Sequence, residues 1–89
     1  MTFLDRESGE TIQHFVARIY QERGYVSDNL ELLALGICEE AGEVAAAILD
    51  DNPAFKQKPG REPSLLKHEL IDLLTYIAAL ANAAGYELI

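Results

Sequence analysis

The chain has 89 residues, of which 49% are hydrophobic, and it carries a formal net charge of −8 at pH 7. This length predicts one domain spanning residues 1–89. The excess of acid argues against a nucleic-acid partner, because phosphate backbones recruit Lys and Arg. The N-terminus lacks the features of a signal peptide, and the longest uncharged segment, residues 73–86, is too short to span a bilayer. We therefore expect a cytoplasmic protein that does not bind a membrane.

The hydrophobic fraction is larger than a lone small bundle can easily cover, because a chain of this length buries only about 60% of its unfolded surface. The surplus predicts a homo-oligomer, with a symmetric dimer as the simplest form. Cys38 is the single cysteine, which excludes an internal disulfide and fits a reducing compartment. Because Cys38 lies in an apolar segment, we expect it to be a small core residue.

The first predicted helix is amphipathic. Its apolar residues follow the i, i+3, i+4, i+7, i+8 rule and are Ile12, Phe15, Val16, Ile19 and Tyr20. Thr2 and Ser8 are both plausible N-caps, and Gly24 is a good C-terminal stop.

The second predicted helix starts at a capping box formed by Asp28 and Glu31 and runs to about Asp50. Residues 51–64 contain all three prolines and predict a loop. The third helix is expected to begin near Pro63 or Ser64 and to close at Gly85. The predicted fold class is all-α, a helical hairpin of the second and third helices with the N-terminal helix packed across it.

Five acidic residues interrupt two otherwise apolar helices. Glu39, Glu40 and Glu43 are the only charges between residues 32 and 49, and Glu69 and Asp72 are the only charges between residues 69 and 86. Both helices look nearly buried, and buried charge is costly unless it is paired or binds a metal. The alternative is that these acids form an ordinary solvated face.

The spacing of the acids favours a shared cation. Glu40 and Glu43, like Glu69 and Asp72, are three residues apart and so share a helix face. If the helices pair antiparallel, the two pairs face each other with Glu39 on the flank. An all-oxygen ligand set selects a hard ion such as Mg²⁺ or Mn²⁺. Because protein-bound Mg²⁺ usually meets substrate phosphates, the pattern indicates cleavage of a phosphoryl or phosphoric-anhydride bond.

The segments EEAGEVAAAI and HELIDLLTYIAALANAAGYEL, with RGY at residues 23–25, resemble the MazG-like all-α nucleotide pyrophosphohydrolases. The signature of that family is EExxE followed by ExxD, and the resemblance covers roughly residues 10–88. It implies four-helix-bundle units completed by dimerisation, as homodimers or homotetramers. It also implies Mg²⁺-dependent hydrolysis of nucleoside triphosphates to monophosphate and pyrophosphate, with a house-cleaning role, which is the removal of unwanted nucleotides.

The resemblance also assigns site residues. It implies that Glu40, Glu43, Glu69 and Asp72 are metal ligands and that Glu39 is a further ligand or the general base for the attacking water. Substrate phosphates need positive partners, and a nucleotide could also meet residues of the first helix or an aromatic ring. The candidates for these contacts are Lys56, Lys58, Arg61, Lys67, Arg18, His14 and Tyr76. The alternatives are ordinary surface charges for the lysines and Arg61 and a core aromatic for Tyr76.

Two other functions stay open at this point. The chain also resembles phosphoribosyl-ATP pyrophosphohydrolases in length and helical design, but it lacks the Tyr-His pair that usually follows the ExxD aspartate, having LLTYI at residues 73–77. It could also be a non-catalytic helical interaction module on the same scaffold.

Overall fold

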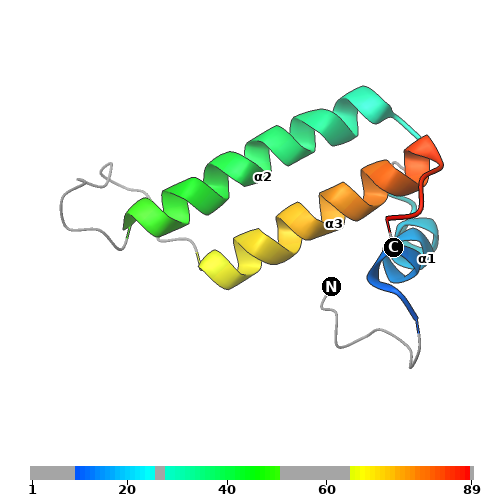
Figure 1. Cartoon of the computed structure of the whole chain (residues 1–89), viewed down its shortest axis with the longest axis horizontal. Helices are drawn as coiled ribbons and strands as arrows, with labels where there is room; N and C mark the ends of the chain where they lie inside the picture. Colours follow the sequence, from blue (N-terminus) through cyan, green and yellow to red (C-terminus); the bar gives the residue numbers. More distant parts are fainter. Residues whose placement is uncertain (1–9, 26–27, 51–64, 89) are drawn as a thin grey trace.

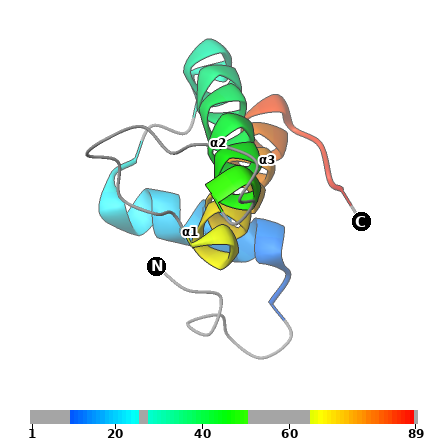
Figure 2. The ribbon, with the colours of Figure 1, turned by 90° about the vertical axis from the view of Figure 1, so that its left-hand side faces the viewer.

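The computed structural model describes residues 10–25, 28–50 and 65–88, which contain three α-helices and no strand. The helices are α1 (Ile12–Arg23), α2 (Leu30–Asp50) and α3 (Leu66–Ala84). Figure 1 shows α2 and α3 side by side and antiparallel, and Figure 2 shows α1 crossing this hairpin. The predicted all-α hairpin with an N-terminal helix packed across it is confirmed. The predicted loop at 51–64 lies outside the described residues.

The ends of α1 are set by local hydrogen bonds. The Thr11 hydroxyl accepts a hydrogen bond from the backbone N–H of His14 at 3.1 Å, so Thr11 is the N-cap in place of the predicted Thr2 or Ser8, which lie outside the described residues. Gly24 adopts a left-handed conformation with φ of 66° and ends the helix. The predicted stop is therefore confirmed.

The predicted capping box at the start of α2 is wrong by one residue. The side-chain oxygen of Asn29, not that of Asp28, accepts a hydrogen bond from Leu32 N–H at 2.9 Å. Helix α3 starts at Leu66, after the predicted positions 63 and 64, which lie outside the described residues, and its N-cap Leu65 offers no side-chain hydrogen bond. Its predicted end at Gly85, with φ of 81°, is confirmed.

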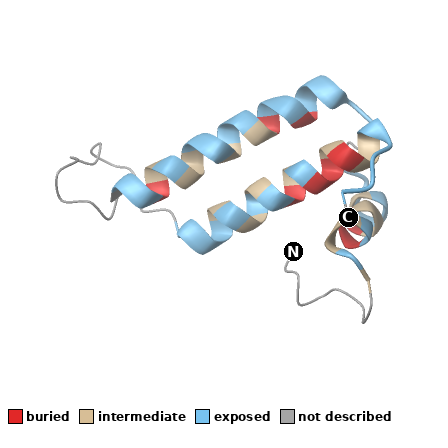
Figure 3. Ribbon diagram, in the orientation of Figure 1, coloured by how far each residue is buried: buried red, intermediate tan, exposed pale blue. Residues whose placement is uncertain are grey.

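The core lies where α1 meets the C-terminal half of α3. Its buried members come from all three helices and are Phe15, Val16, Ile19, Leu33, Ala78 and Ala79. The alanines of α3 are small, so the larger side chains of α1 can approach the helix backbone closely. This contact holds α1 across the hairpin (Figure 3).

Helix α2 is far more exposed than its apolar sequence predicts. Leu35 and Ile48 are 66% and 54% exposed, and Cys38 is exposed as well. The expectations that α2 is nearly buried and that Cys38 is a core residue are wrong for the single chain. The reason is that α1 packs mainly on α3, which leaves α3 as the main neighbour of α2. No helix in the described ranges is long and apolar enough to cross a membrane.

Candidate functional site

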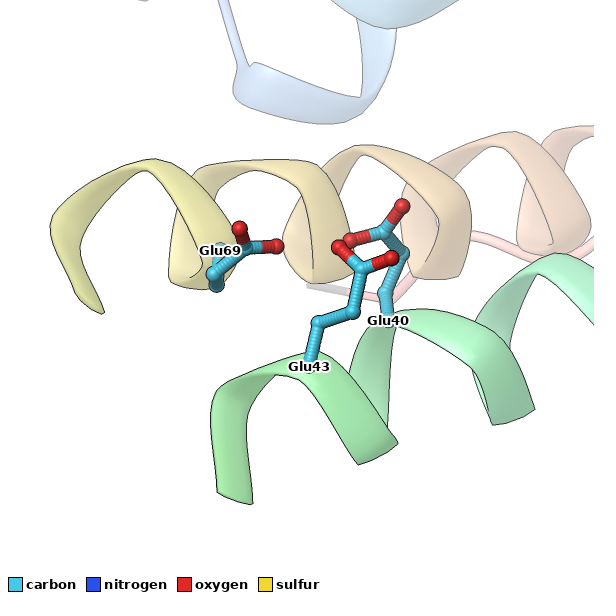
Figure 4. A group of neighbouring side chains, drawn as sticks. All are labelled: Glu40, Glu43 and Glu69. Atoms are coloured by element: carbon cyan, nitrogen blue, oxygen red, sulfur yellow. The ribbon is translucent and has the colours of Figure 1, made fainter. Parts of the chain in front are cut away.

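Three of the predicted metal ligands meet between α2 and α3. Glu40 and Glu43 project from one face of α2 because they are three residues apart, and Glu69 projects toward them from α3 (Figure 4). One carboxylate oxygen from each residue can be chosen so that all three lie within 4.8 Å of one another. The antiparallel hairpin therefore brings together acids that are far apart in the sequence.

Two oxygens of this cluster have no hydrogen-bond partner. Oε2 of Glu40 and Oε2 of Glu69 are both buried and unpartnered. A buried carboxylate oxygen without a partner destabilises the fold unless a cation or a proton compensates it. The donor set consists of oxygen atoms alone, so the residues present fit a hard divalent cation such as Mg²⁺ or Mn²⁺.

The electrostatic effect of the cluster is clearest in the pKa of Glu40. The pKa of Glu40 is raised from 4.5 to about 7, mainly by burial and in addition by the negative charges of Glu43, Asp72 and Glu69. A cation between these groups would reverse the effect, because positive charge favours the ionised form. A cation bound here would therefore displace a proton from Glu40.

Asp72 and Glu39 lie beside the three clustered acids. Both are exposed and line the same pocket as Glu40. Asp72 is outside the group of three, although its charge contributes to the raised pKa of Glu40. Glu39 directly precedes Glu40 on α2. Both carboxylates can therefore reach a ligand that enters the pocket.

The pocket has a volume of about 550 Å³ and lies between α1 and the hairpin. Its aromatic lining consists of Tyr20, Tyr25 and Tyr76. The Gly24 turn folds the chain back so that Tyr25 N–H donates to the Tyr20 carbonyl at 2.9 Å. The Tyr20 and Tyr25 rings then meet edge to face, with centroids 5.3 Å apart. One end of this pocket is thus acidic and the other aromatic.

The Tyr20 hydroxyl stays protonated in this setting. Burial raises the pKa of Tyr20, and the neighbouring Tyr76 and Tyr25 raise it further. Tyr20 is therefore uncharged at neutral pH and suits contact with a planar, weakly polar group.

The predicted substrate-binding cations do not gather at the described part of the site. Arg18 forms ion pairs with Glu10 at 3.0 Å and Glu22 at 3.4 Å, and these contacts raise its pKa. Lys67 is exposed and does not line the pocket. Lys56, Lys58 and Arg61 lie outside the described residues.

His14 lines a second pocket of about 630 Å³ on the other side of α1. There the Gln13 side chain accepts a hydrogen bond from Leu88 N–H at 3.0 Å and donates one to the Tyr86 carbonyl. Asn82 donates to the Gln13 carbonyl at 3.0 Å and so links α3 to α1. These contacts hold the C-terminal segment against α1, away from the acids.

Among the lining residues of the acidic pocket that sequence reasoning did not find are Tyr20, Tyr25 and Gly36. The position of Tyr25 was informative, because it directly follows a helix-ending glycine. Such a glycine turns the chain back toward the helix that it ends. Gly36 was informative as well, because glycine inside a helix usually has a packing reason.

The comparisons with known proteins agree with this geometry. Residues 28–88 match the MazG nucleotide pyrophosphohydrolase domain family. The match covers more than half of the chain and includes both acidic helices, so the chain belongs to this family. Comparisons with curated proteins and with solved structures gave no significant match.

Proposed function

We propose that the protein is a divalent-metal-dependent pyrophosphohydrolase that cleaves nucleoside triphosphates to the monophosphate and pyrophosphate. The observation that carries this proposal is the pair of buried, unpartnered oxygens on Glu40 and Glu69 next to a pocket with an aromatic end. Membership of the MazG family supports the reaction class. The biological role we propose is the removal of unwanted or modified nucleotides.

The residues of the chain would have different roles in this reaction. Glu40, Glu43 and Glu69 would hold Mg²⁺ or Mn²⁺, with Asp72 completing the set from the pocket wall. The ion supplies positive charge that polarises phosphate oxygens when it is bound. Glu39, exposed on the flank of the cluster, is placed to take the proton of the attacking water. The tyrosines receive the base by stacking and exclude water from one side of it.

These observations favour the proposed activity over the two alternative functions. A phosphoribosyl-ATP pyrophosphohydrolase usually has a Tyr-His pair after the aspartate, whereas here Tyr76 alone occupies the next turn of α3 and lines the pocket. A non-catalytic module would have no use for unpartnered buried carboxylates, which are costly to retain.

The direct test measures pyrophosphate release from a panel of nucleoside triphosphates with Mg²⁺ or Mn²⁺. Glu40→Gln should lower kcat/KM by at least about 100-fold, because it removes a ligand charge next to the reacting phosphates. Glu31→Gln is the matched control, since Glu31 is an exposed acid in the first turn of the same helix. Equal activity in the two variants, or no turnover by the wild type, would contradict the proposal.

We also propose that a second copy of the chain completes a four-helix unit. Exposed or half-exposed apolar residues recur along one stripe of each hairpin helix, on the side away from Glu39 and Asp72. These residues are Leu30, Ile37 and Ile48 on α2, and Leu66, Leu70 and Ile77 on α3. Such an apolar face marks an interaction surface.

The oligomer proposal is tested by the solution mass from light scattering. Leu70→Glu should give a monomer, because it places a charge in the middle of the α3 stripe. Leu49→Glu should keep the wild-type mass, since Leu49 is a similarly exposed leucine that lies off the α2 stripe. A monomeric wild type, or an unchanged mass in Leu70→Glu, would rule out this interface.

A further inference from the structure

Gly36 lies in the interior of α2, where glycine is less favourable than alanine. It is buried and lines the acidic pocket together with Tyr76. A Cβ atom built on Gly36 would lie 2.4 Å from Cε1 of Tyr76 and 2.7 Å from Cδ1 and Cζ. The Tyr76 ring therefore occupies the space that a side chain at position 36 would need.

Helix α2 contains a second glycine that makes a useful contrast. A Cβ atom on Gly42 would meet nothing within 4 Å. The two glycines have the same helix propensity but different surroundings. Of these two glycines, Gly36 is the one that permits a close approach between the backbone of α2 and a side chain of α3.

This contact lies one helical turn from the acids on both helices. Gly36 is four residues before Glu40, and Tyr76 is four residues after Asp72. Because Gly36 and Tyr76 both line the pocket, a ring pushed away from α2 can move into the pocket. A side chain at position 36 would therefore narrow the pocket next to the acids without touching them.

We propose that Gly36 is a specificity-determining residue: its missing side chain keeps the Tyr76 ring against α2 and so fixes the room left for the base of a nucleotide. This inference rests on the proposed nucleotide pyrophosphohydrolase function. It adds a residue that acts through Tyr76 and has no direct contact with the metal or the phosphates. It predicts that a substitution at position 36 changes the selectivity between large and small bases more than it changes the binding of the phosphates.

The test compares Gly36→Ala with Gly42→Ala, which adds the same methyl group to the same helix. Gly36→Ala should raise KM by about tenfold or more for purine nucleoside triphosphates and by less for pyrimidine ones, with kcat changed little. Gly42→Ala should leave both values at the wild-type level. Mn²⁺ binding by calorimetry should be the same in all three proteins, because the acids are untouched.

A rescue variant separates a pocket effect from general damage. Tyr76→Leu removes the ring that the new methyl group would meet, so Gly36→Ala/Tyr76→Leu should have the same KM values as Tyr76→Leu alone. Binding can be followed without turnover through tyrosine fluorescence, because the chain has four tyrosines and no tryptophan. The probes are non-hydrolysable purine and pyrimidine triphosphate analogues. If Gly36→Ala fails to fold, Tyr76→Leu alone must shift binding toward the larger base.

The outcomes distinguish this inference from the proposed function. Wild-type turnover with the same KM ratio between bases in Gly36→Ala and Gly42→Ala would overturn the role of Gly36 and leave the function standing. An unchanged base preference in Tyr76→Leu would also overturn it. A wild type that neither binds nor cleaves any nucleotide would contradict the function itself.

Discussion

The two halves of α3 are built in different ways. In the C-terminal half, Ala78 and Ala79 are buried against α1, and the buried Thr75 hydroxyl is satisfied by donating to the Ile71 carbonyl at 2.8 Å. In the N-terminal half, Leu66 and Leu70 are exposed, and Glu69 keeps a buried oxygen without a partner. The C-terminal half packs against α1 and satisfies its buried hydroxyl, whereas the N-terminal half leaves a buried carboxylate oxygen without a partner and two leucines exposed.

This contrast assigns stability and function to different parts of one helix. Ala78, Ala79 and the buried residues of α1 that pack on them should affect folding and leave chemistry alone. Residues around the acids should do the reverse, and removing charge there should even stabilise the metal-free protein. Three experiments test whether stability and function are separated in this way.

The largest effect on stability should come from Phe15→Ala. The Phe15 side chain is fully buried at the contact between α1 and the C-terminal half of α3. Its removal should lower the free energy of unfolding by about 3–5 kcal/mol, the usual range for a buried Phe→Ala change. Urea denaturation monitored by circular dichroism measures it. A loss below about 1 kcal/mol would show that this half of α3 is not the centre of the fold.

The pH dependence of the metal-free protein should be set in part by Glu40. Because its pKa is about 7 in the folded protein and near 4.5 in the unfolded chain, the folded state binds more protons between these values. The stability contribution of the protonated group is therefore present at low pH and is lost as pH rises toward 7. Above that range it should change little.

This effect is measured as the difference in Tm between Glu40→Gln and the wild type in EDTA. The difference should grow in favour of Glu40→Gln as pH increases from 4.5 to about 7. Added Mn²⁺ should raise the Tm of the wild type and have little effect on the variant. A difference that is constant with pH would show that Glu40 is not strained in the metal-free fold.

The smallest of the three effects should come from Arg18→Ala. Arg18 pairs with Glu10, whose side chain is only 4% exposed, so the variant should have a lower Tm through the loss of this ion pair. KM for nucleotide should stay at the wild-type value, because Arg18 does not line the pocket. Glu22→Ala is the milder control, since Glu22 is more than half exposed. A raised KM with an unchanged Tm would show instead that Arg18 contacts the substrate.

Much of the fold was readable from the sequence. The apolar period of residues 12–20 and the glycines at 24 and 85 gave the helices and two of their ends, because these signals are local. The N-caps at Thr11 and Asn29 were missed, since several neighbouring residues compete for each capping position. The exposure of α2 was also missed, because it depends on where α1 packs and not on the composition of α2.

The acidic cluster was predictable and the aromatic end of its pocket was not. Glu40, Glu43 and Glu69 share faces by helical spacing alone, so an antiparallel hairpin is enough to bring them together. The position of Tyr76 depends on the missing side chain of Gly36, which is a contact between two helices. A single sequence does not report such a pairing.

The central claim, that the hairpin acids bind a divalent cation, is tested most directly by crystals grown with Mn²⁺. Anomalous diffraction at the manganese edge locates the ion without any assumption about activity. The account predicts a peak between α2 and α3 within about 2.0–2.3 Å of carboxylate oxygens of Glu40, Glu43 and Glu69. Full occupancy of Mn²⁺ elsewhere, with these three carboxylates free of metal, would contradict it.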